Sequence, residues 1–369
     1  MTWSTEIVES IEQVDPREWD QLVKEHSFAS QRWLKVTEAV LLNHHPRYVL
    51  LRRDGQLQAG AVCYLQNQFQ SQVLQTGLGW FIGRFPGLRC AVPIAYDPGL
   101  FFCDEELAEE LLPELLKSIQ ALIRRDRISF HTIDHLLSAN TDWAFLQAHG
   151  YHRIGHLAEI YLDLPWTSFE DYLKQLSSKK RKEYMRISRR LEREGILLEL
   201  ADLQTEDMGI LRELVNNVFK HHNEPNVYTD DLFLKASHMM GDDFKLVVAH
   251  QNGKTIGCIA MLRGGNEWIC KWMGLNYQQT LDSGAYYGLL AECIRYSIQA
   301  KGTRLRMGAT SYQTKQHFGV TVERRIGALA FQNRLAHHLA GSTLRVTTSL
   351  KLGWPIAQSS MDEIKRDAK

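Results

Sequence analysis

The chain has 369 residues, of which 44% are hydrophobic and 23% are charged, which is typical of a soluble globular protein long enough for two domains. Lysine plus arginine and aspartate plus glutamate both number 43, so the formal net charge of zero argues against nonspecific nucleic-acid binding by the whole surface. No stretch reaches the length of a transmembrane helix, and the acidic N-terminus is unlike a secretory signal, so we expect a cytoplasmic protein with no membrane partner. The six cysteines form no CxxC pair, and we expect their thiols to be reduced.

Residues 1–165 predict a first α/β domain. Hydrophobic periodicity and turn residues place helices from Pro16 and over 27–42, and a hairpin of strands 48–51 and 57–65 around Asp54-Gly55. A helix over 104–125, a strand over 128–133, a short helix over 143–149 and one strand over 154–164 complete it.

Residues 166–340 predict a second α/β domain, followed by a C-terminal tail over 341–369. Its expected helices are 168–176, 177–194, 205–220, 230–240 and one from 284 to about 300. Its expected strands are 196–200, 246–250, 256–262, 268–275 and 303–307, with 325–331 closing the same sheet and 344–350 in the tail.

Two segments of the first half have counterparts in the second. DGQLQAGAVCYL (54–65) resembles NGKTIGCIAML (252–262), and HGYHRIGHLAEIYLDL (149–164) resembles FGVTVERRIGALAF (318–331) in position and type. Two copies of one mixed α/β unit would explain the length, although hairpins with such turns are common enough for coincidence to stay open.

The helix predicted over 177–194, SSKKRKEYMRISRRLEREG, is strongly basic. Its first turn carries four consecutive cations at the positive end of the helix dipole, and a bound phosphate would relieve their repulsion. The candidate phosphate ligands are Lys179, Lys180, Arg181 and Arg186. A solvated basic face is the alternative interpretation.

The segment from Asp282 to Gly319 carries the second candidate site. The turn at Ser283-Gly284 precedes a helix whose first N–H groups can bind an anion or oxyanion. After the strand at 303–307, Lys315 can bring a positive charge to the same place. Trp268 and Trp272 have the same strand parity and are expected on one face, as core residues or as a pocket wall.

The loop HHNEPNVYTDD, which begins at His221, supplies a candidate general base. Imidazole titrates near neutrality, so His222, with Glu224 beside it, could deprotonate an amine nucleophile; surface histidines are the simpler interpretation. The 15 histidines show no zinc spacing, and neither a GxSxG elbow nor a P-loop is present, so we expect no metal site and no serine-hydrolase or P-loop chemistry.

Together these motifs resemble the FemAB-like branch of the GNAT acyltransferase superfamily. The resemblance rests on SSKKRKEYMRISRRLEREGI, DDFKLVVAHQNGKTIGCIAML, LDSGAYYGLLAECIRYSIQAKG and RLRMGATSYQTKQHFG, and it covers about 169–331. The first half, from SFASQRWL to IYLDL, resembles the degenerate partner domain of the same family. The resemblance implies an α/β fold with mixed sheets, arranged as two tandem GNAT-like domains with a cleft between them.

Relatives of this kind transfer an acyl or aminoacyl group from coenzyme A or from an aminoacyl-tRNA to an amine. The resemblance therefore implies acyl-CoA or aminoacyl-tRNA as the donor substrate, no tightly bound cofactor, and direct transfer without a covalent enzyme intermediate. Lys315 matches the lysine that Fem-type peptidyltransferases place near the reacting carbonyl. The pyrophosphate loop of standard GNAT enzymes is replaced by residues 278–284, so the donor stays open.

The acceptor would be an amine of a small molecule or peptide, and tRNA a partner in one of the two cases. The expected substrate pocket consists of Trp272, Tyr286, Tyr287, Thr310, Tyr312 and Phe318. Two other functions remain open at this point: a non-catalytic module that binds nucleic acid or a phosphorylated polymer, and a modifier of a peptidoglycan or polysaccharide precursor. The oligomeric state is not predicted.

Overall fold

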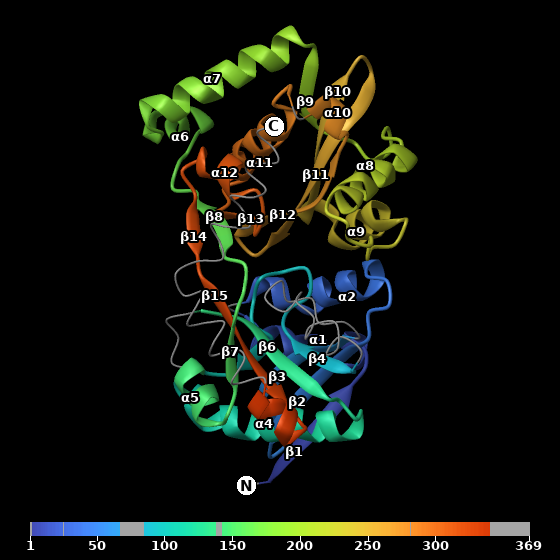
Figure 1. The fold of residues 1–369 in the computed structure, drawn as a ribbon, viewed down its shortest axis with the longest axis vertical. Helices are drawn as coiled ribbons and strands as arrows, with labels where there is room; N and C mark the ends of the chain where they lie inside the picture. The colour runs from blue at the N-terminus through green and yellow to red at the C-terminus, as the bar shows by residue number, and fades with distance from the viewer. Residues whose placement is uncertain (1, 25, 67–84, 138–141, 281, 340–369) are drawn as a thin grey trace. The chain divides into compact units, whose positions relative to one another are not determined.

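The computed structural model describes residues 2–24, 26–66, 85–137, 142–280 and 282–339. The chain forms two compact units. Unit 1 comprises residues 1–38, 43–158 and those from 324 onward, and unit 2 comprises residues 39–42 and 159–323. Each unit is an α/β body built on one mixed sheet (Figure 1).

Unit 1 has an eight-stranded sheet. The strand order is β1 (Trp3–Val8), β2 (Pro46–Arg53), β3 (Gln56–Gln66), β4 (Gly87–Cys90), β6 (Phe130–Leu137), β15 (Arg325–Phe331) and β7 (His152–Gly155), with β5 (Leu100–Phe102) also paired to β3. All pairs are antiparallel except β4 with β6. The helices are α1 (Pro16–Leu22), α2 (Gln31–Val40), α4 (Ala108–Arg125) and α5 (Asp142–Ala148).

Side chains alternate between the two faces of strand β3, and the two sets contact different helices. Ala59, Ala61 and Cys63 belong to the apolar core that α4 fills with its leucines and isoleucines. Gly60, of opposite parity, lies against Trp19 and Leu22 of α1. Helices therefore cover both faces, as a sheet with apolar residues on both sides requires.

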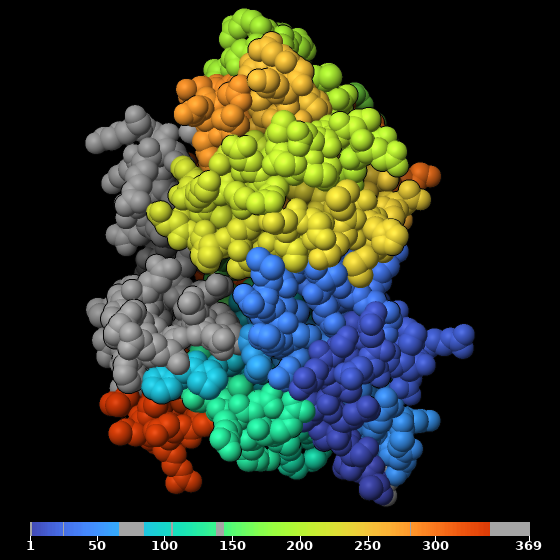
Figure 2. Space-filling model, turned by 90° about the vertical axis from the view of Figure 1, so that its right-hand side faces the viewer, coloured from blue at the N-terminus to red at the C-terminus, as the bar shows by residue number. Residues whose placement is uncertain are grey.

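Unit 2 has a seven-stranded sheet. The strand order is β14 (Thr321–Glu323), β8 (Glu159–Asp163), β13 (Arg304–Gly308), β12 (Glu267–Leu275), β11 (Lys254–Gly264), β10 (Phe244–Gln251) and β9 (Ile196–Leu200). The helices are α6 (Phe169–Gln175), α7 (Ser178–Arg193), α8 (Met208–His221), α9 (Leu232–Met240), α10 (Tyr277–Thr280), α11 (Ala285–Gln299) and α12 (Tyr312–Gln316). Helices α8 and α9 form the surface of unit 2 on the side that faces the viewer in Figure 2. Among the described residues, no helix is both long enough and apolar enough to cross a bilayer.

The internal repeat predicted from the hairpins is confirmed. Each unit has an antiparallel hairpin, β2–β3 and β10–β11, closed by a two-residue turn with both residues at positive φ: Asp54-Gly55 and Asn252-Gly253. Each hairpin has a bulge shortly after the turn, where the second strand has one extra residue, Gln58 in β3 and Ile256 in β11. In each unit one parallel strand pair follows, β4 with β6 and β12 with β13.

The ends of the two sheets differ from the sequence prediction. The single strand expected over 154–164 is two strands, β7 in the sheet of unit 1 and β8 in the sheet of unit 2. Strand β15, which was expected to close the second sheet, pairs with β6 and β7 in the first. The chain therefore passes from unit 1 to unit 2 between residues 158 and 159 and returns between residues 323 and 324, whereas the sequence predicted a boundary between 165 and 166. The boundary differs because each sheet is completed by a strand from the other half of the chain. The strand predicted at 344–350 and the tail lie outside the described residues.

Candidate active site in unit 2

Lys315 lies on the short helix α12, just after strand β13. The chain leaves β13 through Gly308 and enters α12 through Ser311, both with left-handed backbone conformations (φ 79° and 53°). This sharp reversal turns Lys315 into the interior, where only 1% of its surface is exposed. The predicted catalytic lysine is thus one of the largest fully buried side chains described.

In the part of the chain that the structure describes, no carboxylate pairs with the Lys315 ammonium group. Burial lowers the pKa of Lys315 to about 7, because the charged form loses its hydration; nearby Cys270 opposes this change and Lys271 adds to it. Among the described residues, none forms a hydrogen bond or an ion pair with its side chain. A positive charge held in this way is stabilised by any anion that binds beside it, which is the property needed at an oxyanion or phosphate site.

Aromatic side chains pack in the core directly after α12, where the Phe318 amide donates to the Lys315 carbonyl. Tyr287 stacks on Phe318 with the ring centroids 4.3 Å apart, and the Tyr172 hydroxyl donates a hydrogen bond of 3.0 Å to the Phe318 carbonyl. The Tyr287 hydroxyl is buried without a hydrogen-bond partner, and burial raises its pKa. Tyr312 is half-buried against the same core, whereas Thr310 is exposed. The structure therefore brings Tyr287 and Phe318 together, as the sequence predicted.

Two cysteines lie in the core of unit 2, and the pKa of one of them is strongly raised. Cys270 lies on β12 and Cys293 on α11, and both are buried. Burial raises the pKa of the Cys293 thiol well above its ordinary value, and Cys270 raises it further. Because the thiolate is the reactive form, a buried thiol of this kind is inert.

The turn at Ser283-Gly284 contacts α7. Gly284 has φ 82°, and a Cβ atom there would come within 2.8 Å of Ile187 on α7. Arg190 of α7 donates a hydrogen bond to the Asp282 carbonyl, and Ser283 is 4% exposed, with its hydroxyl accepting from the Ala285 amide. In this structure Gly284 allows α7 to pack closely against the start of α11, and Ser283 bonds within the turn. The contact of these two residues with a donor phosphate stays a prediction.

Trp272 is not on the face predicted for it. Strand β12 has a bulge opposite Ile259 and Ala260, and Trp272 is the bulged residue, with φ 47°. A bulge reverses the parity of the residues that follow it. Trp268 consequently packs edge-on against Tyr296 of α11, whereas Trp272 packs against Phe233 of α9 and against Tyr228. The expectation that the two tryptophans share a face was wrong.

His222 and Glu224 are both exposed at the C-terminal end of α8. The neighbouring His221 stacks on Tyr277, with ring centroids 4.1 Å apart, and Tyr277 packs against the core cluster that contains Phe318. His221 is therefore the imidazole of this pair that the structure connects to the site. His221 is exposed as well, and its stacking on Tyr277 is what distinguishes it from His222. The sequence could not separate the two, because a helix end does not fix which side chain packs against a neighbouring element.

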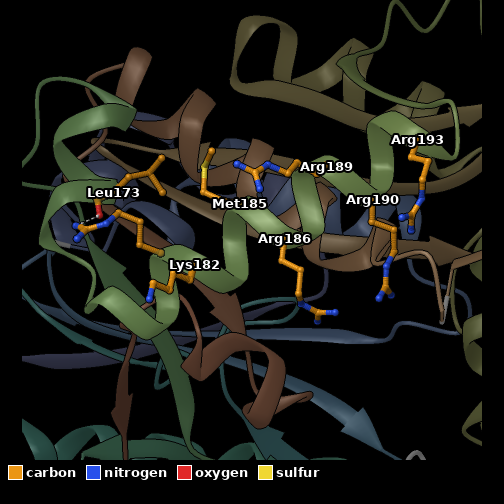
Figure 3. A pocket seen from close by; sticks show the side chains of 8 residues that line it. Leu173, Lys182, Met185, Arg186, Arg189, Arg190 and Arg193 are labelled. Carbon is orange, nitrogen blue, oxygen red and sulfur yellow. Dashed lines mark hydrogen bonds between the residues drawn. The ribbon is translucent and has the colours of Figure 1, made fainter.

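The basic helix is confirmed as α7, with the Ser177 hydroxyl accepting from the Lys180 amide at its N-cap. A groove of about 850 Å³ runs along it (Figure 3). Its lining among the described residues is Leu173, Arg181, Lys182, Met185, Arg186, Arg189, Arg190 and Arg193. In Figure 3, Arg186 and Arg190 extend to one side of α7, and Met185 and Arg189 to the other. Six cations around one groove are a concentrated positive surface in a chain with zero formal charge.

The four cations predicted to hold phosphate have different surroundings. Arg181 donates to the carbonyls of Leu173 and Lys174, so it caps the end of α6. Arg186 forms a bidentate pair with Glu183, at 2.9 and 2.6 Å. Lys179 is exposed and Lys180 half-buried in the first turn, and neither lines the groove. Lys182 and Arg189 line the groove instead. The spacing of the cations along one helix could have indicated from the sequence that they share a face.

The sequence profile of a family described as peptidoglycan biosynthesis/recognition matches residues 10–330, which is most of the chain. The chain belongs to the FemAB-like family. No curated protein sequence matches this FemAB-like chain.

Solved structures share its fold at low sequence identity. A structure of FemX has a TM-score of 0.61 at 12% identity and covers 91% of this chain and 100% of its own. A tandem GNAT protein from the clavulanic acid biosynthesis pathway has a TM-score of 0.54 at 13% identity, covering 89% and 99%. The structure of L-PGS from Bacillus licheniformis has a TM-score of 0.54 at 11% identity, covering 93% and 98%. The expected tandem GNAT-like α/β fold is thereby confirmed.

Proposed function

We propose that this FemAB-like chain is an N-acyltransferase that moves an acyl or aminoacyl group from an ester or thioester to an amine. The observation that carries the proposal is Lys315, whose buried ammonium group has no ion-pair partner among the residues that the structure describes, in the unit that has the basic helix α7. The amine attacks the donor carbonyl, and the negative charge that develops on the carbonyl oxygen is stabilised by the Lys315 ammonium. Membership of the family supports this class of reaction.

The transfer is direct, without an acyl-enzyme intermediate. Cys270 lies near Lys315 and is buried, and the raised thiol pKa of the neighbouring Cys293 disfavours attack on an ester. The attacking amine must lose a proton, and His221, stacked on Tyr277, is a better placed base than His222 or Glu224.

The donor carries phosphate, and the groove along α7 binds it. Lys182, Arg189 and Arg193 supply free positive charge there, and Arg186 shares its charge with Glu183. Either coenzyme A or the acceptor end of a tRNA has the required phosphates. The acceptor amine belongs to a small molecule or peptide, and the family description supports a peptidoglycan precursor.

The test measures donor binding and transfer separately. Acyl-CoAs and aminoacyl-tRNAs are screened for thermal stabilisation, since a donor in large excess over its Kd stabilises the protein by RT ln(1 + [L]/Kd). Amide formation is then measured with the donor found, using wild type, Lys315→Met, and Lys254→Met as an exposed control. Loss of about a hundredfold or more in rate in the first variant alone supports the role of Lys315. An unchanged rate, or no stabilisation by either donor class, refutes the assignment.

The alternative is a non-catalytic module that binds nucleic acid or a phosphorylated polymer, and the α7 groove is the observation that favours it. Contact with several phosphates gives a linear fall of log affinity with log salt concentration. Salt-dependent tRNA binding that persists in Lys315→Met, with no acyl transfer to any amine by wild type, favours the module over the enzyme.

A further inference from the structure

The C-terminal end of α12 lies against the junction of α6 and α7. The Tyr172 hydroxyl of α6 donates to the Phe318 carbonyl at 3.0 Å, and a Cβ atom on Gly319 would lie 3.4 Å from Leu176. His317, the C-cap residue of α12, is exposed at this junction. It is therefore an imidazole beside α7 that the acyl transfer proposed above does not use.

Charged side chains of α7 lie around this imidazole. Glu183 forms the bidentate pair with Arg186, and the hydrogen bond from Arg186 lowers the pKa of this carboxyl group against the effect of burial. The charges of Arg186, His317 and Arg190 lower it further, so all three lie close to Glu183. From α11, Tyr287 packs edge-on against the His317 ring, with centroids 6.4 Å apart.

The junction has more positive charge than one carboxylate can neutralise. The Glu183 carboxylate cancels the charge of Arg186, and a protonated His317 restores it. Arg190 donates to the Asp282 carbonyl, which is a neutral acceptor, so this bond leaves its charge uncancelled. A phosphate group has both the negative charge and the acceptor oxygens that three cations around one carboxylate would stabilise.

The α7 groove of about 850 Å³ provides space for such a group. Arg186 and Arg190 line it, and in Figure 3 both extend to the same side of α7. His317 and Lys315 are two residues apart, so their side chains leave α12 in different directions. Lys315 enters the core, whereas His317 stays exposed. One short helix thus presents one side chain toward the proposed reacting carbonyl and another toward the groove side of α7.

We propose that Arg186, Arg190 and His317 form a phosphate subsite for the donor, and that His317 makes donor binding depend on pH. This role rests on the acyl transfer proposed above, because the phosphate belongs to the donor. Imidazole is the side chain whose charge changes between about pH 5 and 8, so the subsite gains a cation as the pH falls. Coenzyme A and tRNA both carry the phosphate that it would bind.

The test measures the binding of coenzyme A and of deacylated tRNA separately, by calorimetry at constant ionic strength near pH 6 and near pH 8. His317→Gln should weaken binding about tenfold near pH 6, the effect of one lost charge-assisted hydrogen bond, and hardly at all near pH 8. His317→Arg keeps its charge and should bind about tenfold more tightly than wild type near pH 8. Comparing variants at each pH cancels the ionisation of the ligand itself.

His238→Gln is the matched control, because this exposed histidine lies in the last turn of α9 in the same unit and should bind both probes as wild type does. A loss of affinity in His317→Gln that is equal at both pH values would mean that the ring acts by packing on Tyr287, and this overturns the proposal. Unchanged affinity at both pH values, or no binding of either probe, also overturns it.

The two proposals for unit 2 can fail separately. A pH-dependent loss of binding in His317→Gln, together with no acyl transfer by wild type, supports the subsite and refutes the enzyme. Acyl transfer by wild type, with donor binding that does not depend on His317, supports the enzyme and refutes the subsite.

Discussion

Replacing Lys315 with methionine should make the protein more stable and less active. Methionine keeps the length and most of the packing of the lysine stem but removes the charge. The pKa of Lys315 is lowered from 10.5 to about 7, because its ammonium group is buried without a counterion. This pKa difference corresponds to about 5 kcal/mol, at 1.36 kcal/mol for each factor of ten.

The sign follows from proton binding in the two states. Below about pH 7 the lysine is charged both folded and unfolded, and the full cost of burying the charge lowers the free energy of unfolding. Between about pH 7 and 10.5 only the unfolded chain holds the proton, so this cost shrinks as the pH rises. Lys315→Met should thus be more stable than wild type by up to about 5 kcal/mol near pH 6 and by only about 1 kcal/mol near pH 10.

Urea unfolding of both proteins at several pH values measures this difference. Lys254→Met removes an exposed charge and should change the free energy of unfolding by less than about 0.5 kcal/mol at every pH. A Lys315→Met protein that is less stable than wild type, or whose added stability does not depend on pH, would show that the folded protein already neutralises this charge. Greater stability with lost transfer would be the trade-off expected of a functional residue.

Three further predictions concern residues of unit 2. Glu159→Gln removes the charge of the carboxylate that pairs with the buried Arg306 and should lower the free energy of unfolding by about 3–5 kcal/mol, measured by urea unfolding. Gly284→Ala places a methyl group against Ile187 at a left-handed backbone position and should cost roughly 1–3 kcal/mol; an unchanged melting temperature would mean that α7 moves away freely. Arg189→Glu should weaken tRNA binding at low salt and lower the salt slope by about one or more, and an unchanged slope would remove the α7 groove from the phosphate contact.

Local sequence was enough to place α7 and the paired hairpins. Ser177 at the N-cap and Gly195 after the last turn bound one helix, and the turns at Asp54-Gly55 and Asn252-Gly253 adopt the positive φ values that those residues favour. These signals act over a few residues, so they do not depend on which strand becomes a neighbour in the sheet.

The side of the sheet that a residue faces was predicted less well. The parity of β12 places Trp272 beside Trp268, but the bulge opposite Ile259 reverses it. Because a bulge is fixed by the pairing of two strands, the sequence of one strand does not reveal it. The exchange of β8 and β15 between the sheets is the same kind of feature, since it depends on which edge is available and not on strand propensity.

The sequence by itself determined that the chain is a repeated α/β protein with a basic helix and a lysine after a strand end. Only the tertiary structure decided the burial and the electrostatic environment of those residues. Burial gives Lys315 its lowered pKa, and the Glu183 and carbonyl contacts of Arg186 and Arg181 reduce the charge they offer. The buried contacts of Arg89 and His156 with Asp134 in unit 1 were not predicted, because strands distant in the sequence bring these residues together. Electrostatic environment depends on the distance between atoms and on access to water, and a linear pattern specifies neither.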